Sequence, residues 1–143
     1  MPRIKIDLPG NFNFTATIPV RITDINYGGH VGNDTILSIL HEARVQFLNF
    51  HGYSELNCGG AGLIMSDVAI EFKSELFYGD TIIAAVAATG FSKVAFEIYY
   101  QLEKQNGEKR SVIAIAKTGM VFFDYAAKKI TQVPGEVIEK FSA

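Results

Sequence analysis

The sequence predicts a single α+β domain in which a five-stranded antiparallel sheet wraps around one long helix. Apolar residues alternate with polar ones in several separate segments, and one long helical repeat follows the first of them. The connections among the later segments are short, which favours antiparallel neighbours. With 143 residues, 48% of them hydrophobic, the chain has the size and composition of one domain, 1–143, with a buried core.

The first strand is expected over residues 12–22. Pro19 has no N–H to donate to a neighbouring strand, so we expect this strand at a sheet edge or with a bulge at that point. Every second position of the segment is apolar: Phe12, Phe14, Ala16, Ile18, Val20 and Ile22.

The long helix is expected over residues 34–50. Asn33 or Asp34 is a natural N-cap, and Gly52 is a plausible stop signal. The apolar arc is wide, which suits a helix wrapped by a sheet. Its apolar side chains recur at helical spacing, at Ile36, Leu40, Ala43, Phe47 and Phe50.

The remaining strands are expected over 63–73, 80–89, 92–103 and 110–123, with a short helix after Pro134. Asn106-Gly107 is a strong hairpin signal between the last two strands. The segment 80–89 is apolar on both sides, and one helix cannot cover both faces of such a sheet. A second copy of the chain is the simplest cover, so we expect a homo-oligomer.

Composition argues against several classes of function. The formal net charge is −2 with no run of like charges, so neither nucleic acid nor a membrane surface is an expected partner. A single cysteine and three scattered histidines predict no internal disulfide and no metal site. No signal-peptide pattern is present, and the longest apolar run, 82–88, is too short to span a bilayer. These features predict a cytoplasmic protein.

The stretch from Asp24 to Arg44 carries the candidate chemistry. Backbone N–H groups at the start of a helix lack partners within the helix and favour negative charge, so those of Gly32, Asn33 and Asp34 could hold an oxyanion. Glycines let a ligand carbonyl approach the backbone closely. The groups that could position or deprotonate a water are Asp24, Asn26, His30, His41 and Glu42. Taken together these features indicate acyl chemistry, although the same residue types also occur in purely structural strand-to-helix loops.

Residues 21–44, RITDINYGGHVGNDTILSILHEAR, resemble the motif of hotdog-fold acyl-CoA thioesterases of the 4-hydroxybenzoyl-CoA thioesterase type. That motif is D-x-D-x-x-G-H-V-x-N-x-x-Y-L, followed by a helix that ends in E-A-R. The resemblance implies the hotdog fold, a homodimer or homotetramer, and an acyl-CoA or related thioester as substrate. Coenzyme A would be part of the substrate, with no other cofactor. The matching positions are Asp24, Gly29, His30, Val31, Asn33, Leu37, Glu42, Ala43 and Arg44.

The sequence departs from the motif at its chemical centre. The second Asp of D-x-D is the family's usual nucleophile or general base, and Asn26 stands in its place. An amide cannot take a proton at neutral pH. Related branches place the working carboxylate on the helix instead, which makes Glu42 the first substitute and Asp24 the second.

The expected reaction is hydrolysis of an acyl-CoA or acyl-carrier thioester. In this interpretation the carbonyl oxygen points at the N–H groups of Gly32 and Asn33, beside Gly29, while Asn26 and His30 orient the carbonyl or the water. Two alternatives stay open: a hydratase or dehydratase that uses His30 and Glu42, and a non-catalytic acyl-CoA-binding protein. Candidate phosphate contacts are Lys73, Lys93 and Lys117.

Overall fold

The structure, a computed structural model, describes residues 3–142. It contains a long helix α1 (Asn33–Phe50), a shorter helix α2 (Gly135–Ser142) and a 3-10 turn η1 (Ile22–Asp24). The strands are β1 (Phe14–Pro19), β2 (Gly62–Phe72), β3 (Thr81–Thr89), β4 (Ala95–Asn106), β5 (Lys109–Asp124) and the two-residue β6 (Lys129–Ile130).

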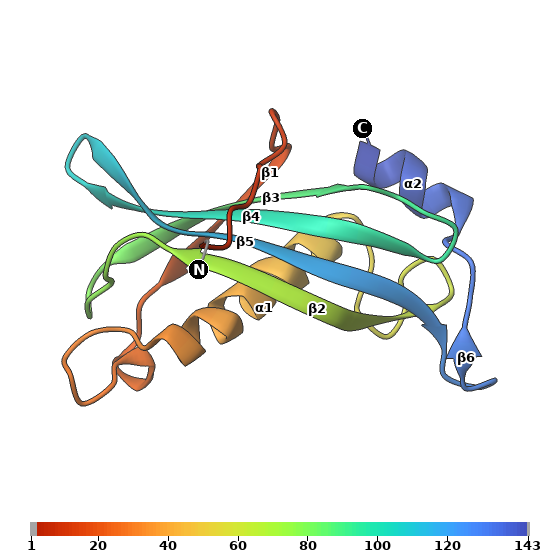
Figure 1. Cartoon of the computed structure of the whole chain (residues 1–143), viewed down its shortest axis with the longest axis horizontal. Coiled ribbons are helices and arrows are strands. Elements are labelled where there is room, and N and C mark those ends of the chain that lie inside the picture. The colour runs from red at the N-terminus through yellow and green to blue at the C-terminus, as the bar shows by residue number, and fades with distance from the viewer. Residues whose placement is uncertain (1–2, 143) are drawn as a thin grey trace.

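The main sheet has the strand order β1-β3-β4-β5-β2, and every neighbouring pair is antiparallel. The short β6 pairs with β5 beyond this path. Helix α1 lies along one face of the curved sheet (Figure 1). The α+β architecture predicted from the sequence is therefore confirmed.

The strand expectations agree with the structure to within one residue at β2, β3 and β5, whereas β4 begins and ends three residues later than the expected 92–103 and β1 is shorter than expected. β1 spans Phe14–Pro19 only, because the chain turns into η1 and leaves Ile22 on the surface. Pro19 does lie on an edge strand, as predicted. The hairpin at Asn106-Gly107 and the short helix after Pro134 are also present.

Helix α1 begins one residue earlier than expected. Gly32, with an extended backbone (φ −72°, ψ 155°), is the N-cap, so the prediction of Asn33 or Asp34 was wrong. The helix ends at Phe50, as predicted, and Gly52 follows two residues later with a left-handed φ of +82° that suits glycine. There the N–H of Tyr53 donates to the carbonyl of Leu48 at 2.9 Å.

The core fills the space between α1 and the inner face of the sheet. Alternate residues of β4 and β5 point inward, as the sequence periodicity predicts. Burial of these large side chains is the main stabilising contribution, at about 25 cal/mol per Å² of apolar surface. The largest fully buried side chains include Leu40, Leu48, Phe96, Ile98, Tyr100, Leu102, Met120 and Phe122.

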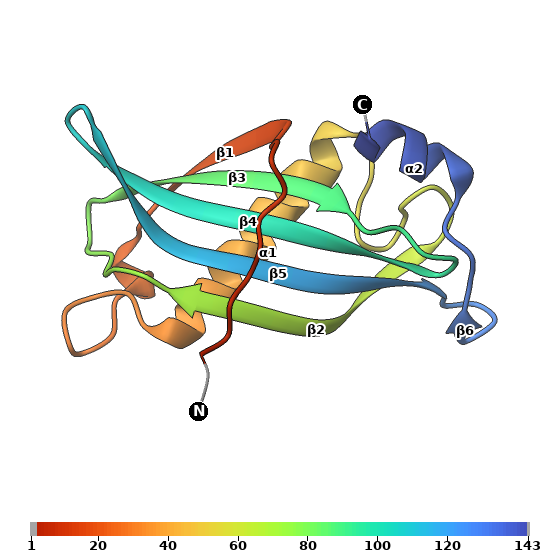
Figure 2. The same cartoon turned by 45° about the horizontal axis from the view of Figure 1, so that its top comes forward.

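The outer face of the sheet is crossed by the chain's own amino-terminal segment, residues 3–13 (Figure 2). The N–H of Ile6 donates to Glu71 Oε2 at 2.7 Å and ties this segment to β2. The uncovered apolar surface lies instead along the free edge of the sheet, where Met65, Val68 and Phe72 of β2 are 38%, 37% and 48% exposed. Exposed apolar side chains therefore occur at the β2 edge, whereas the outer face is crossed by the amino-terminal segment. Within residues 3–142, no helix has both the length and the apolar character that crossing a membrane requires.

Candidate active site

The loop before α1 is closed on itself and attached to a distant segment. Ile25 and Val31 form an isolated antiparallel bridge, and the N–H of Asn26 donates to the carbonyl of His30 at 3.0 Å. The N–H of Val31 donates to the carbonyl of Leu76, just before β3, at 2.9 Å. These bonds hold the loop in one place relative to the start of the helix.

Asn26 presents its amide nitrogen to the start of α1. Its Oδ1 accepts a hydrogen bond from the N–H of Gly28 at 2.8 Å, so its Nδ2 is left to face the other way. Nδ2 lies 3.3 Å from the point that a Cβ on Gly32 would occupy. The side chain of Asn26 therefore offers a hydrogen-bond donor at the helix entrance.

The helix entrance, Gly32 to Asp34, has donors without acceptors. No side chain caps α1, and no acceptor bonds the N–H of Asn33 or Asp34 among the residues that the structure describes. The carboxylate of Asp34 folds back over this point, with Oδ1 2.6 Å from the position of a Cβ on Gly32. A negatively charged oxygen is thus already placed where the helix dipole favours it. From the sequence, the Asp34 side chain was expected only as a possible cap, although an acid in the first helical turn is a signal for this placement.

His30 lies beside the entrance with a defined tautomer. Its Nδ1 lies 3.1 Å from the carbonyl oxygen of Val31, which can only accept, so the neutral ring carries its proton on Nδ1 and keeps a lone pair on Nε2. Nε2 is 4.0 Å from Glu75 Oε1. Glu75 has no local sequence signal, because the fold alone brings it to the loop.

A cavity of about 340 Å³ opens next to this group. His30, Asn33, Lys73 and Glu75 line it, together with apolar residues from the ends of β2 and α1. Of the three lysines suggested as phosphate contacts, only Lys73 lines this cavity. Lys117 is paired with Glu97 at 3.0 Å, which raises the pKa of Lys117.

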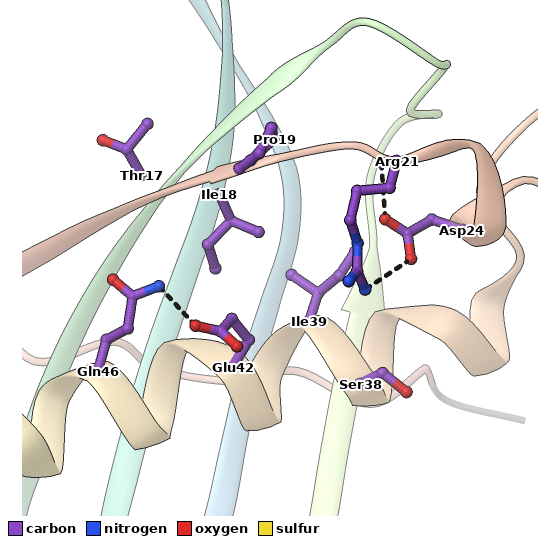
Figure 3. Close-up of a pocket in the computed structure, with 9 residues that line it drawn as sticks. All are labelled: Thr17, Ile18, Pro19, Arg21, Asp24, Ser38, Ile39, Glu42 and Gln46. Carbon is purple, nitrogen blue, oxygen red and sulfur yellow. Dashed lines mark hydrogen bonds and ion pairs between the residues drawn. The ribbon is translucent and has the colours of Figure 1, made fainter.

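Asp24 and Glu42 line a different cavity, of about 150 Å³, between β1 and α1 (Figure 3). Asp24 is buried, and its two carboxylate oxygens accept hydrogen bonds from the backbone N–H of Arg21 at 2.9 Å and from Arg21 Nη2 at 3.4 Å. Glu42 accepts a bond from Gln46 Nε2 at 2.7 Å and is exposed. Asp24 therefore has a structural role as the partner of Arg21.

The sequence-predicted residues thus form two groups. Asn26, His30, Gly32 and Asn33 meet at the helix entrance, whereas Asp24 and Glu42 lie along the other cavity. Glu42 lies nine positions after Asn33, which corresponds to about 14 Å along the helix axis. His30 and Glu42, the pair that a hydratase would need, line different cavities of the chain. Gly29 lies at the exposed tip of the loop with φ of +87° and lines neither cavity.

Comparison with known proteins gives consistent matches over most of the chain. A protein of Aquifex aeolicus (strain VF5) named "Putative esterase" is 26% identical over 122 residues, which are 84% of this chain and 91% of that protein. A thioesterase-superfamily structure from Jannaschia sp. CCS1 aligns with a TM-score of 0.82 at 16% identity, covering 94% of this chain and 84% of the other. A 1,4-dihydroxy-2-naphthoyl-CoA thioesterase from Synechocystis aligns with a TM-score of 0.80 at 23% identity, covering 90% and 95%.

The structural alignments establish that the hotdog fold is shared. The sequence comparison also shows the family. A family model matches residues 20–141, which include the loop, the helix entrance and the whole main sheet after β1. The chain belongs to the Thioesterase-like superfamily.

Proposed function

We propose that the protein is a thioester hydrolase that acts on acyl-CoA or a related acyl thioester, with the helix entrance as its reaction centre. The observation that carries this proposal is the convergence of Asn26 Nδ2 and the unpartnered N–H of Asn33 next to Gly32, which has no side chain. Two donors at a helix N-terminus suit the oxyanion that forms when a carbonyl is attacked.

In the proposed reaction the thioester carbonyl oxygen accepts hydrogen bonds from Asn33 N–H and Asn26 Nδ2, and displaces the Asp34 carboxylate. His30 Nε2 takes a proton from a water molecule, whose oxygen attacks the carbonyl carbon. The resulting imidazolium faces the Glu75 carboxylate. When the tetrahedral intermediate collapses, the C–S bond breaks and the imidazolium returns its proton to the thiolate, which leaves an acid and a thiol.

Membership of the Thioesterase-like superfamily supports this proposal. The name of the Synechocystis protein specifies an aryl acyl-CoA substrate for that protein. Lys73 lies on the same cavity as His30 and Asn33, so it is the lysine best placed to contact a phosphate of coenzyme A. The proposal also includes assembly as a homodimer or homotetramer, and it leaves the acyl group of the substrate to be identified by the assay.

The test is thiol release from a panel of acyl-CoA substrates, followed with a thiol-reactive dye. We expect His30→Gln to lower kcat by about 100-fold or more, as loss of a general base does. Under this proposal Glu42→Gln and Asp24→Asn each leave kcat within a few-fold of the unmodified protein, provided that the fold is intact by circular dichroism.

The alternatives predict other results. A large loss in Glu42→Gln with little change in His30→Gln would assign the base to the helix carboxylate. Acyl-CoA binding without turnover across the panel would identify a non-catalytic acyl-CoA-binding protein, and would overturn the proposed function.

A further inference from the structure

The carboxylate that faces His30 comes from the connection between β2 and β3, residues 73–80, which lies beside the loop before α1 (Figure 2). The Glu75 side chain is 63% exposed, so packing does not hold it against the ring. Its Oε1 is nevertheless 4.0 Å from His30 Nε2. The direction of this side chain therefore depends on how the backbone at Glu75 is held.

The backbone of Glu75 is anchored on both sides of its Cα. Before it, the N–H of Ser74 donates to the carbonyl of Ile113 on β5 at 3.2 Å. After it, the carbonyl of Glu75 accepts a hydrogen bond from Lys104 Nζ on β4 at 2.9 Å. The second anchor is made by a side chain, so a substitution can remove it and leave the sheet's own hydrogen bonds unchanged.

Lys104 is held for this contact by the far end of the same connection. Its side chain is only 15% exposed, and its Nζ lies 3.6 Å from Asp80 Oδ2 and 5.3 Å from the centre of the Phe77 ring. Asp80 Oδ2 also accepts a hydrogen bond from the N–H of Phe77 at 2.9 Å. A largely buried ammonium needs an opposite charge and hydrogen-bond acceptors, and these residues supply them. Lys104 therefore joins residues 75–80 to β4.

The connection is also bonded to the loop that carries His30. The N–H of Val31 donates to the carbonyl of Leu76 at 2.9 Å. This bond sets the residue after His30 against the residue after Glu75. If residues 75–80 moved away from β4, the separation of the Glu75 carboxylate and the His30 ring would change.

We propose that Lys104 is a positioning residue for the reaction. It holds residues 75–80 on β4 and so keeps the Glu75 carboxylate facing the imidazolium that forms on His30. The inference rests on the proposed function for the role of His30. Lys104 acts through Glu75, because Glu75 lines the cavity beside His30 and Lys104 does not.

The first measurement is a double-mutant cycle in the thiol-release assay on the whole protein. Lys104→Met removes the ammonium, and should lower kcat about tenfold with KM nearly unchanged. Glu75→Gln should lower kcat by a similar factor. In the Glu75→Gln background, Lys104→Met should cause little further loss, because no carboxylate is left to position. A merely structural role would cause the same loss in both backgrounds. Lys109→Met, at an exposed position of the same β4–β5 hairpin, is the matched control and should leave kcat unchanged.

The second measurement does not depend on turnover. Hydrogen exchange of the Val31 amide, followed by NMR, reports whether residues 75–80 stay in place beside the loop. We expect this exchange to accelerate by about tenfold in Lys104→Met. The Tyr53 amide, which donates to Leu48 at 2.9 Å beyond the far end of α1, should exchange at its original rate. Lys104→Gln serves in both measurements if Lys104→Met does not fold.

Equal losses of kcat in the two backgrounds, or a kcat that Lys104→Met leaves unchanged, would overturn the positioning role. Unchanged exchange at Val31 would overturn the anchor on which this role depends. Faster exchange at Val31 in a protein that releases no thiol from any substrate would leave the anchor in place while contradicting the proposed function.

Discussion

Asn26 determines which chemistry the helix entrance can perform, because its side chain presents an amide and not a carboxylate to Gly32. In the structure Oδ1 is used by the N–H of Gly28, and Nδ2 faces the helix entrance. Asn26→Asp would keep the acceptor but replace the donor with a charged oxygen, beside the Asp34 carboxylate. We expect kcat/KM for thioester hydrolysis to fall by about 100-fold, the cost of losing an oxyanion donor.

Asn57→Asp is the matched control for this change. Asn57 Oδ1 accepts a bond from the N–H of Gly60 at 3.0 Å, in a similar turn away from the helix entrance. Its substitution should leave kcat/KM unchanged. A rise in turnover on Asn26→Asp would mean that the site lacks a base, and would remove the donor role from Asn26.

His51 gives the stability of the protein a defined dependence on pH. Its ring packs against Phe47 and Phe141, with centroids 4.9 and 5.0 Å away. Burial, and then the charge of Lys140, lower the pKa of His51 below its ordinary value of 6.5. The unfolded chain therefore binds a proton at His51 more readily than the folded protein does. As a result the free energy of unfolding falls as the pH drops below 6.5.

Urea denaturation at neutral pH and at a pH below 6 measures this effect. His51→Gln should remove part of the acid-dependent loss of stability. An equal loss in the unmodified protein and in His51→Gln would show that the ring does not contribute.

At the scale of elements, helix α2 depends on a glycine in the loop after α1. Gly59 has φ of +71°, and a Cβ there would lie 2.8 Å from Val137 Cγ2 of α2 and 3.1 Å from Pro134 Cβ. We expect Gly59→Ala to lower the free energy of unfolding by about 2 kcal/mol, through overpacking and backbone strain. Thermal denaturation followed by circular dichroism measures it.

Gly60→Ala separates the two causes. Gly60 also has a positive φ, of +102°, but a Cβ there meets nothing within 4 Å. Gly60→Ala should lower the free energy of unfolding only through backbone strain. Equal losses in the two variants would show that contact with α2 adds nothing.

The elements themselves were predictable because their signals are local. Alternation over β4 and β5, helical spacing over α1 and the Asn106-Gly107 turn each lie within one stretch of sequence. The features that sequence reasoning missed depend on distant segments or on small shifts of backbone. Glu75 reaches His30 only through the fold, and the N-cap at Gly32 places Asp34 in the first turn of α1 instead of at the cap.

The sequence named the residues of the candidate site but did not show how their side chains are arranged. The motif pointed to the loop before α1, but its spacing could not show that Asp24 is held by Arg21 or that Glu42 lies on another flank of α1. Such distinctions arise from side-chain orientation, which periodicity does not encode.

At the scale of the whole molecule, the free edge of β2 predicts self-association. β2 pairs with β5 on one side only in the part of the chain that the structure describes, and Met65, Val68 and Phe72 are partly exposed along it. We expect a dimer at micromolar concentration by sedimentation velocity. Val68→Lys should weaken the dimer by about tenfold or more, because charged lysines on an edge strand oppose pairing.

Ile130→Lys is the control, since Ile130 is exposed on β6, beyond the path of the main sheet. It should leave the dimer intact. A protein that sediments only as a monomer would contradict the prediction.

The strand order also has a consequence for biosynthesis. β1 and β2 lie immediately before and after α1 in the sequence, but they occupy opposite edges of the main sheet. Phe14 of β1 pairs with Val86 of β3. A nascent chain that ends at Phe72 therefore carries α1 without β3, β4 and β5, the three strands that lie between β1 and β2 in the sheet. At roughly 5–20 residues per second, a ribosome leaves the apolar face of α1 uncovered for several seconds. Co-translational folding must wait for the β3-β4-β5 meander, so a chaperone that shields α1 during this interval should raise the yield of native protein.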